Sequence, residues 1–308
     1  MVLSAIVTQG YNVVGVITET DEFDKKEEEN YQRFAKFGAY DSLKEVANCL
    51  KLPVYQPKNV NSEEFVDKIE EINPNLIVIV SYHTIIKKHL IQKFKNRIIN
   101  VHMAPLPKYR GRAPINWAII NGETHTAITV HFVDEGIDTG PIISQEIIEI
   151  EDDDRAIDVL LKGLPLFPYL VLKSIRFIEE NKVNPKTQDL YDGSYFPKRK
   201  PEDGLIDWCH EKTLDIHNKV RALAYPYPGA FTFIHPEKKV KIERTSMPRN
   251  FRRICPIPGI VFGKVPSGGV KVTTIDGFII IEKVRIDESI YDASEYLKLG
   301  TKLEMGII

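Results

Sequence analysis

The chain has 308 residues, of which 43% are hydrophobic and 27% are charged, and its formal net charge is −2. This composition is typical of a globular protein with room for two domains, and it gives no overall attraction to nucleic acid or to an anionic membrane. The three cysteines are far apart and fit neither a disulfide framework nor a zinc site; without a secretory signal or a membrane-spanning stretch, they predict a cytoplasmic protein.

In the first half of the chain, short apolar runs alternate with helical periodicity, which predicts a largely parallel α/β sheet. Strands are expected at residues 12–18, 53–55, 76–80 and 97–102, and the apolar run 76–80 is expected to be fully buried. Helices are expected at residues 43–50 and 63–73. Ser42 and Glu45 form a capping box before the first helix, and Pro74 ends the second.

The second half begins with two β-rich runs, at residues 126–133 and 141–150. A helical region at 154–181 follows, and Pro165 and Pro168 should kink or split it. A further helix is expected at 213–224, and residues 270–286 read as a hairpin turning at Asp276 and Gly277. We therefore expect a catalytic domain at residues 1–183, a linker at 184–204 and a β-rich domain at 205–308.

Asn100 and His102 stand two residues apart in a strand, so their side chains point to the same side. If this strand is parallel to its neighbours, the pair lies at the carboxyl edge of the sheet, where ligands bind in α/β folds. The sequence DEGIDTG, at residues 134–140, adds two candidate acids, Asp134 and Asp138. An amide, an imidazole and a carboxylate together could stabilise an oxyanion and accept and release one proton. The alternative is a structural histidine and an ordinary turn.

The motifs NVH at residues 100–102, LPKYRG at 106–111 and DEGIDTG resemble those of the N10-formyltetrahydrofolate-dependent formyltransferases. The resemblance covers most of the chain and implies a Rossmann-like formyltransferase domain with a mainly parallel sheet, followed by a smaller, open-barrel-like β domain. It also implies a strand and a substrate-contacting loop before residues 2–9, which this sequence lacks. We therefore expect a shortened gene start, and a truncated, inactive family member is one alternative.

Carried over by the resemblance, Asn100, His102 and Asp138 match the catalytic trio of the family. Asn100 and protonated His102 would hold the tetrahedral oxyanion, while Asp138 would raise the pKa of that histidine. The co-substrate N10-formyltetrahydrofolate would be contacted by Thr84, Ile85, Ile86, Arg112, Asp134, Glu135, Gly136 and Ile137. No metal site is expected, because the histidines and cysteines do not cluster.

Two branches of this family differ in the amine that they formylate. Methionyl-tRNA formyltransferases need a basic surface for RNA, but residues 19–29 hold seven acids against Lys25 and Lys26. Residues 201–308 carry 16 Lys and Arg against 14 Asp and Glu, a weak basic excess. The sequences YRGRAPINWAIINGET and PEDGLIDWCHEKTLDIHNKVRA look most like the domain that formylates UDP-4-amino-4-deoxy-L-arabinose and like other sugar-nucleotide N-formyltransferases.

We therefore expect a nucleotide-linked amino sugar as acceptor, in lipopolysaccharide biosynthesis, with no nucleic acid and no membrane as partner. Arg110 or Arg221 could bind the diphosphate of such a substrate, and buried structural pairing is the alternative for each. A methionyl-tRNA formyltransferase remains the other enzymatic reading. A homodimer is left open.

Overall fold

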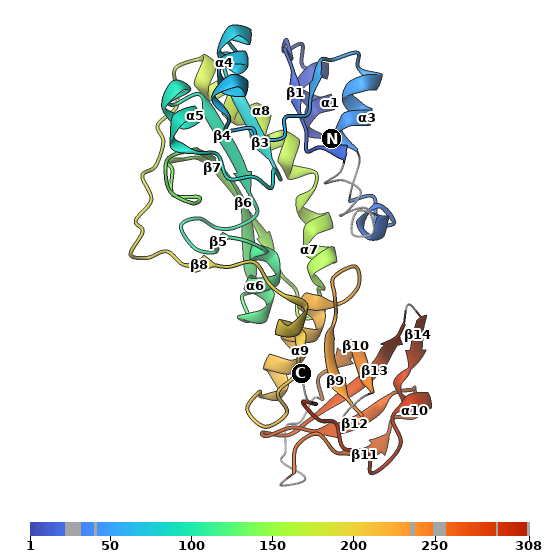
Figure 1. Cartoon of the computed structure of the whole chain (residues 1–308). Coiled ribbons are helices and arrows are strands. Elements are labelled where there is room, and N and C mark those ends of the chain that lie inside the picture. Colours follow the sequence, from blue (N-terminus) through green and yellow to red (C-terminus); the bar gives the residue numbers. More distant parts are fainter. Residues whose placement is uncertain (22–31, 40–41, 235–237, 249–256, 288, 307–308) are drawn as a thin grey trace. The chain divides into compact units, whose positions relative to one another are not determined.

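The computed structural model describes residues 1–21, 32–39, 42–234, 238–248, 257–287 and 289–306 (Figure 1). The chain divides into two compact units, which are described separately. The first comprises Met1–Pro114, His125–Glu149 and Leu160–Pro197, and the second comprises Ile115–Thr124, Ile150–Val159 and Lys198–Ile308. The domain limits expected from the sequence stay a prediction. Most of the acidic segment at 19–29 lies outside the described residues.

The first unit contains a four-stranded sheet in the order β3-β4-β6-β7 and two smaller sheets. The strands of the main sheet are β3 (Ile77–Val80), β4 (Ile98–His102), β6 (His125–Phe132) and β7 (Ile142–Glu149). The smaller sheets pair β1 (Val16–Ile17) with β2 (Val54–Tyr55) and β5 (Arg110–Gly111) with β8 (Tyr195–Phe196). The mixed α/β class is confirmed. β4 is parallel to β3 but antiparallel to β6, so it has the expected direction relative to only one neighbour.

The helices begin and end close to their sequence signals. Helices of the first unit are α1 (Val2–Thr8), α3 (Leu43–Cys49), α4 (Glu63–Ile72), α5 (Lys88–Lys93) and α8 (Leu166–Glu179), while α6 (Pro114–Ile120) and α7 (Ala156–Gly163) contribute residues to both units. The Ser42 hydroxyl caps α3 by accepting from the N–H of Glu45 at 3.3 Å. Pro165 separates α7 from α8, as predicted. Within the described residues, no helix has the length and apolar character needed to cross a bilayer.

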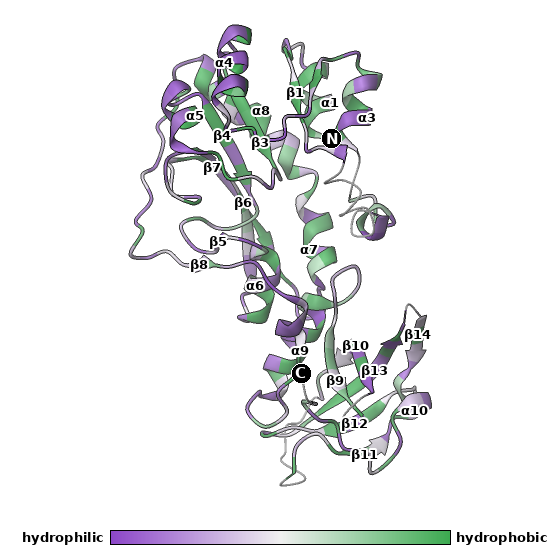
Figure 2. Cartoon of the chain, in the orientation of Figure 1, coloured by the Kyte–Doolittle hydropathy of each residue, from purple (hydrophilic) through white to green (hydrophobic). Residues whose placement is uncertain are grey.

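The core of the first unit gathers apolar side chains from α4, α5 and β4, and β3 lies at its margin. Its buried residues are Val60, Val66, Ile69, Leu90, Phe94 and Ile98, and Ile17, Ile77 and Ile79 pack against them. The expected full burial of the apolar run of β3 is wrong, because all four of its residues are only half-buried. Among the described strands β3 pairs with β4 alone, so its other edge has no described strand beside it. Figure 2 shows the hydrophobic colouring of β3 and β4.

The second unit is built on an antiparallel sheet that does not close into a barrel among its described strands. Its strands are β9 (Ala230–Phe233), β10 (Lys239–Ser246), β11 (Val261–Lys264), β12 (Val270–Thr273), β13 (Phe278–Ile286) and β14 (Ser289–Asp292). Its helices are η1 (Pro201–Gly204), α9 (Thr213–Leu223) and α10 (Ala293–Tyr296). The predicted hairpin is confirmed by the pairing of β12 with β13.

Some buried polar groups of the second unit are paired with one another. The indole N–H of Trp208, a side chain only 2% exposed, donates to the Thr232 hydroxyl at 2.9 Å. Arg285 and Glu243 are both buried and form an ion pair of 3.1 Å. The other carboxylate oxygen of Glu243 accepts from the backbone N–H of Tyr225 at 2.6 Å. Buried charges are tolerated only with such partners.

Candidate active site

Asn100 and His102 project from the same side of β4 and meet the carboxylate of Asp138, which lies in the loop between β6 and β7. The Nδ2 of Asn100 donates to Oδ1 of Asp138 at 3.4 Å. The Nδ1 of His102 lies 3.7 Å from Oδ2 of the same carboxylate. The three residues proposed from the sequence as a catalytic trio are therefore neighbours, and they are largely sheltered from solvent.

A fourth residue, His131, completes this cluster and was missed in the sequence. It lies opposite Asn100 in the pairing of β4 with β6, with its Nε2 3.6 Å from Oδ1 of Asp138 and 3.1 Å from Nδ2 of Asn100. Its Nδ1 lies 2.8 Å from the carbonyl oxygen of Phe132. A proton on Nδ1 satisfies that carbonyl, and Nε2 lies between the amide of Asn100 and the carboxylate of Asp138. Only the strand register brings His131 here, and one sequence does not give that register.

The Asp138 carboxylate is kept charged by its surroundings. Burial would raise the pKa of this group, but the hydrogen bond with His131, the charge of His102 and the N–H of Gly111 together lower the pKa to about 2. Hydrogen bonding to the charged form favours that form. At neutral pH the site therefore holds one fixed negative charge between two imidazoles.

His102 is buried beneath the loop that follows β4. Burial lowers the pKa of this histidine below its ordinary 6.5, and the opposing influences of Asp138 and the Tyr109 carbonyl do not offset it. The Nε2 of His102 lies 2.9 Å from the Tyr109 carbonyl oxygen, which places the proton of the neutral ring on Nε2. Nδ1 then faces Asp138 with a lone pair, ready to receive a proton next to a carboxylate.

The loop after β4 is held by the segment that contains β8. The backbone N–H of Tyr109 donates to the Ser194 hydroxyl at 2.9 Å, and that of Arg110 donates to the Ser194 carbonyl at 2.9 Å. The ring of Tyr109 stacks on that of Phe196 with centroids 5.0 Å apart. The N–H of Gly111 points to Asp138, so this loop and the acid are joined directly.

The residues proposed from the resemblance to contact folate lie on two loops of the same unit. Thr84, Ile85 and Ile86 follow β3, and the guanidinium of Arg112 donates to the carbonyl of His83 at 2.9 Å, beside them. Asn61 fixes this loop from both sides, because its side chain donates to the Ile85 carbonyl and accepts from the Lys87 N–H. Ile85 is nevertheless 64% exposed, so its apolar side chain is available to a ligand.

The second loop carries Asp134, Glu135, Gly136 and Ile137. The Asp134 carboxylate accepts from the N–H of Gly136 at 3.1 Å and from the Thr139 hydroxyl at 2.6 Å, so it shapes its own loop. Glu135 pairs with Lys88 at 3.1 Å, and Ile137 is 41% exposed. Each of the two loops therefore combines one exposed isoleucine with backbone groups that are held by side-chain hydrogen bonds.

The two candidate arginines for a diphosphate have different surroundings. In the second unit, Arg221 is buried and donates to the side chain of Asn218 and to the carbonyls of Glu151 and Asp154, all within 3.1 Å. These bonds support the structural alternative for Arg221. In the first unit, the Nε of Arg110 is buried without a hydrogen-bond partner among the described residues. Arg110 therefore stays a candidate.

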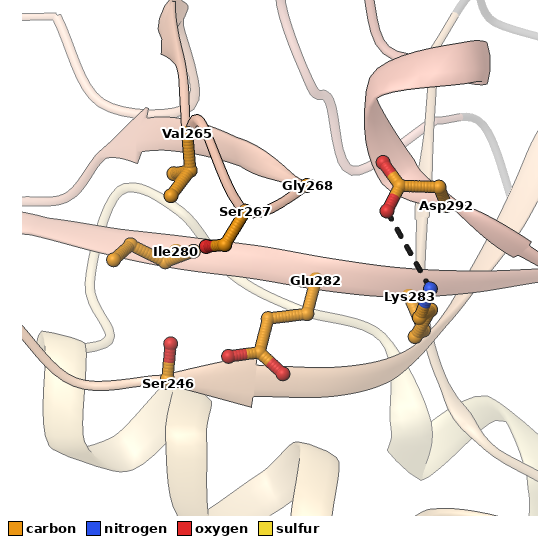
Figure 3. A pocket seen from close by; sticks show the side chains of 8 residues that line it. All are labelled: Ser246, Val265, Ser267, Gly268, Ile280, Glu282, Lys283 and Asp292. Atoms are coloured by element: carbon orange, nitrogen blue, oxygen red, sulfur yellow. Dashed lines mark hydrogen bonds and ion pairs between the residues drawn. The ribbon is translucent and has the colours of Figure 1, made fainter.

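A pocket of about 230 Å³ lies in the second unit, and none of the site residues predicted from the sequence lines it (Figure 3). It is lined by Ser246, Val265, Ser267, Gly268, Ile280, Glu282, Lys283 and Asp292. Its charged groups are already paired, since Lys283 lies 3.5 Å from Asp292 and Glu282 lies 3.1 Å from Arg244. In the part of the chain that the structure describes, no group of histidines, cysteines and acids is arranged to hold a metal.

Comparison with known proteins places both halves of the chain. The formyl transferase family profile matches residues 2–163, and the formyl transferase C-terminal domain profile matches residues 198–299. The methionyl-tRNA formyltransferase of Clostridioides difficile (strain 630) is 33% identical over 307 residues, covering 99% of this chain and 94% of that protein. The bifunctional polymyxin resistance protein ArnA of Wigglesworthia glossinidia brevipalpis is 36% identical over 238 residues, which are 77% of this chain and 34% of that protein.

A solved structure is similar over nearly the same length. The N-formyltransferase from Helicobacter canadensis, in complex with folinic acid and dTDP-3-aminofucose, has a TM-score of 0.64 and 26% identity, covering 91% of this chain and 93% of that one. Two family profiles in order, a relative matched over almost the whole chain and this shared fold agree with one another. The chain belongs to the formyl transferase family and is a formyltransferase.

Proposed function

We propose that this protein transfers the formyl group of N10-formyltetrahydrofolate to the amine of a nucleotide-linked amino sugar. Formyl-folate is the co-substrate, and the amine of the sugar is the nucleophile. The observation that carries the chemical part is the cluster of Asn100, His102 and Asp138. It places an amide donor 3.4 Å and an imidazole nitrogen 3.7 Å from a carboxylate whose pKa is lowered to about 2.

In this reaction the amine attacks the formyl carbon, a C–N bond forms, and the formyl oxygen becomes an oxyanion. The Nδ2 of Asn100 stabilises that charge, and such a donor is worth about 3 kcal/mol in a preorganised site. His102, which is neutral at rest, takes the proton that the amine loses and becomes an imidazolium beside the oxyanion. The bond to N10 of the folate then breaks, and the proton lost by the amine ends on N10. Asp138 favours the imidazolium of His102 while this proton moves.

The folate is held, in this proposal, by the loops at 84–86 and 134–137 and by Arg112. Ile85 and Ile137 supply exposed apolar contact. Backbone groups of the two loops supply hydrogen bonds, and Asn61 keeps the first loop in place. Arg112, anchored at the His83 carbonyl, supplies positive charge beside the first loop.

The sugar acceptor is supported by the resemblance to a structure that contains dTDP-3-aminofucose and by the similarity to ArnA. The near balance of 16 basic and 14 acidic residues in 201–308 also argues against a strongly basic RNA surface. The rival acceptor is methionyl-tRNA, favoured by the relative from Clostridioides difficile that matches 99% of the chain. If the acceptor is a sugar nucleotide, Arg110 is the candidate to meet its diphosphate.

The decisive experiment offers both acceptors with N10-formyltetrahydrofolate. UDP- and dTDP-linked amino sugars are tested in one set of reactions and charged initiator methionyl-tRNA in another, and the N-formyl product is measured by mass spectrometry. Formylation of a sugar nucleotide supports the proposal, whereas formylation of the tRNA alone overturns the choice of acceptor. Asn100→Ala in parallel shows whether the product depends on this site, since loss of one oxyanion donor should cost about 100- to 1,000-fold in rate.

A further inference from the structure

Gln188 lies in the segment between α8 and β8 and reaches into the loop that carries Asp138. It is only 7% exposed. Its Nε2 donates to the carbonyl oxygen of Asp138 at 2.9 Å and to that of Gly140 at 2.6 Å. One side-chain amide thus bridges two backbone carbonyls on either side of Thr139.

The chain brings Gln188 to this place by a local antiparallel pairing. Lys186 and Ile142 exchange two backbone hydrogen bonds of 2.8 Å, and in an antiparallel pair the residue two positions beyond Lys186 lies opposite Gly140. At Gly140 the loop passes close to the end of β6, because a Cβ there would stand 1.8 Å from the Phe132 carbonyl oxygen. The bridging amide therefore meets a loop whose backbone is already constrained.

The Asp138 backbone has a left-handed conformation, which is uncommon for residues that carry a side chain. Its φ is 54°, a left-handed conformation that costs a residue with a side chain about 1–2 kcal/mol. Any relaxation of this backbone would swing the carboxylate away from His102 and His131, which lie on the strands β4 and β6. Two hydrogen bonds from Gln188 oppose that relaxation.

The side-chain amide of Gln188 adds little net stability, but it holds two backbone carbonyls in place. Its Oε1 is buried and has no hydrogen-bond partner among the described residues. A buried acceptor left unpaired costs about 1–3 kcal/mol, which offsets much of what the two donated bonds contribute. A methionine of similar size would avoid this cost, so the distinctive effect of glutamine is to fix the two carbonyls.

We propose that Gln188 is a positioning residue for Asp138: it fixes the loop backbone so that the carboxylate stays between the two imidazoles during formyl transfer. This inference rests on the proposed function, because it assigns Asp138 a part in the reaction. Gln188 does not touch the reacting atoms, and it acts only through the place of the acid.

The test substitutes Gln188→Met, which keeps the size of the side chain and removes its donors. The expected result is a fall in kcat of about 10- to 100-fold, as for a small misplacement of a reacting group, with little change in either KM. By NMR, the pKa of His102 should fall further, because Asp138 is the group that raises it. Ser174→Ala is the matched control, since it removes a buried hydroxyl bond of 2.8 Å to Ser144 and should leave kcat unchanged.

A double-mutant cycle separates this proposal from the one that it rests on. If Gln188 acts through Asp138, Gln188→Met lowers kcat in the wild type but has almost no further effect in Asp138→Asn. An equal loss in both backgrounds, or an unchanged kcat in the folded Gln188→Met variant, overturns the positioning role. Wild-type kcat in Asp138→Asn alone instead overturns the proposed part of Asp138. If Gln188→Met does not fold, Gln188→Glu is the second variant. It keeps the size and polarity of the side chain but turns a carboxylate toward both carbonyls. Wild-type kcat in that variant also overturns the proposal.

Discussion

The backbone N–H of Gly111 donates a hydrogen bond of 2.9 Å to Oδ2 of Asp138. This bond joins the loop after β4 to the loop after β6 through the one charged group between His102 and His131. Gly111 has a φ of 97°, and a Cβ there would stand 2.3 Å from the Phe196 carbonyl oxygen. Because glycine has no Cβ, the backbone can pass this close to Phe196 and still direct its N–H at Asp138.

Gly111→Ala should weaken both folding and activity. The added methyl must push the backbone away from Phe196, and we expect the free energy of unfolding to fall by about 1–3 kcal/mol. Because the N–H moves with the backbone, kcat should fall by at least about 10-fold. Gly10→Ala is the control: its φ is 84° but nothing lies within 4 Å of the new methyl, so it should cost stability and leave kcat unchanged. Equal kcat in both variants would count against a role for this N–H.

Asp138→Asn should lower kcat by about 100-fold or more, because the charge that favours the imidazolium of His102 is lost. The same change has a signature in acid unfolding. The pKa of Asp138 is about 2 in the folded protein, below its ordinary 3.8, so its stabilising effect is present above about pH 4 and is lost as the pH falls through 2. Chemical denaturation of both proteins between pH 2 and 5 should show a smaller acid loss of stability in the variant.

His102→Gln should flatten the pH dependence of stability on the acid side of neutrality. Burial lowers the pKa of His102 in the folded state, so the unfolded chain takes up a proton near pH 6.5 before the folded protein does. The free energy of unfolding should therefore fall as the pH drops below 6.5, and less steeply in the variant. Burial also lowers the pKa of His217, in the second unit, so His217→Gln should remove a separate part of this slope. An unchanged slope in both variants would contradict the burial of these imidazoles.

Arg285→Met should destabilise the second unit strongly. It leaves the Glu243 carboxylate buried without its partner at 3.1 Å, which typically costs about 3–5 kcal/mol. The double variant Arg285→Met with Glu243→Gln removes both charges and should recover much of that loss. Thermal unfolding of the three proteins gives the comparison. A double variant as unstable as Arg285→Met would show that the charge of Glu243 is not the cause.

Features set by neighbouring residues were predictable from the sequence. The cap of α3 needs only Ser42 and Glu45, the break between α7 and α8 needs only Pro165, and the turn between β12 and β13 needs only Asp276 and Gly277. Asn100 and His102 were recognised in the same way, from alternation along one strand. Asp138 was added to them by family resemblance; it lies 3.4 Å from Asn100 and 3.7 Å from His102, and the role of the three as a catalytic trio stays a prediction.

Features set by contacts between distant segments were not predictable. His131 joins the site through the register between β4 and β6. Gln188 joins it because Lys186 pairs with Ile142, 44 positions earlier, which brings the Gln188 amide to Gly140, 48 positions earlier. The burial of β3 was overestimated because an apolar run does not reveal how many of its edges are paired. The catalytic roles, the domain limits, the cytoplasmic location and the sugar acceptor stay predictions.

The half-buried strand β3 has a consequence for how the protein behaves in concentrated solution. It is a run of four isoleucines and valines that pairs with β4 alone among the described strands. Alternate N–H and carbonyl groups of such a strand face outward, where they can template the addition of a strand from another molecule. Self-association at high concentration would then begin at residues 77–80, and amide exchange there would slow as the concentration rises.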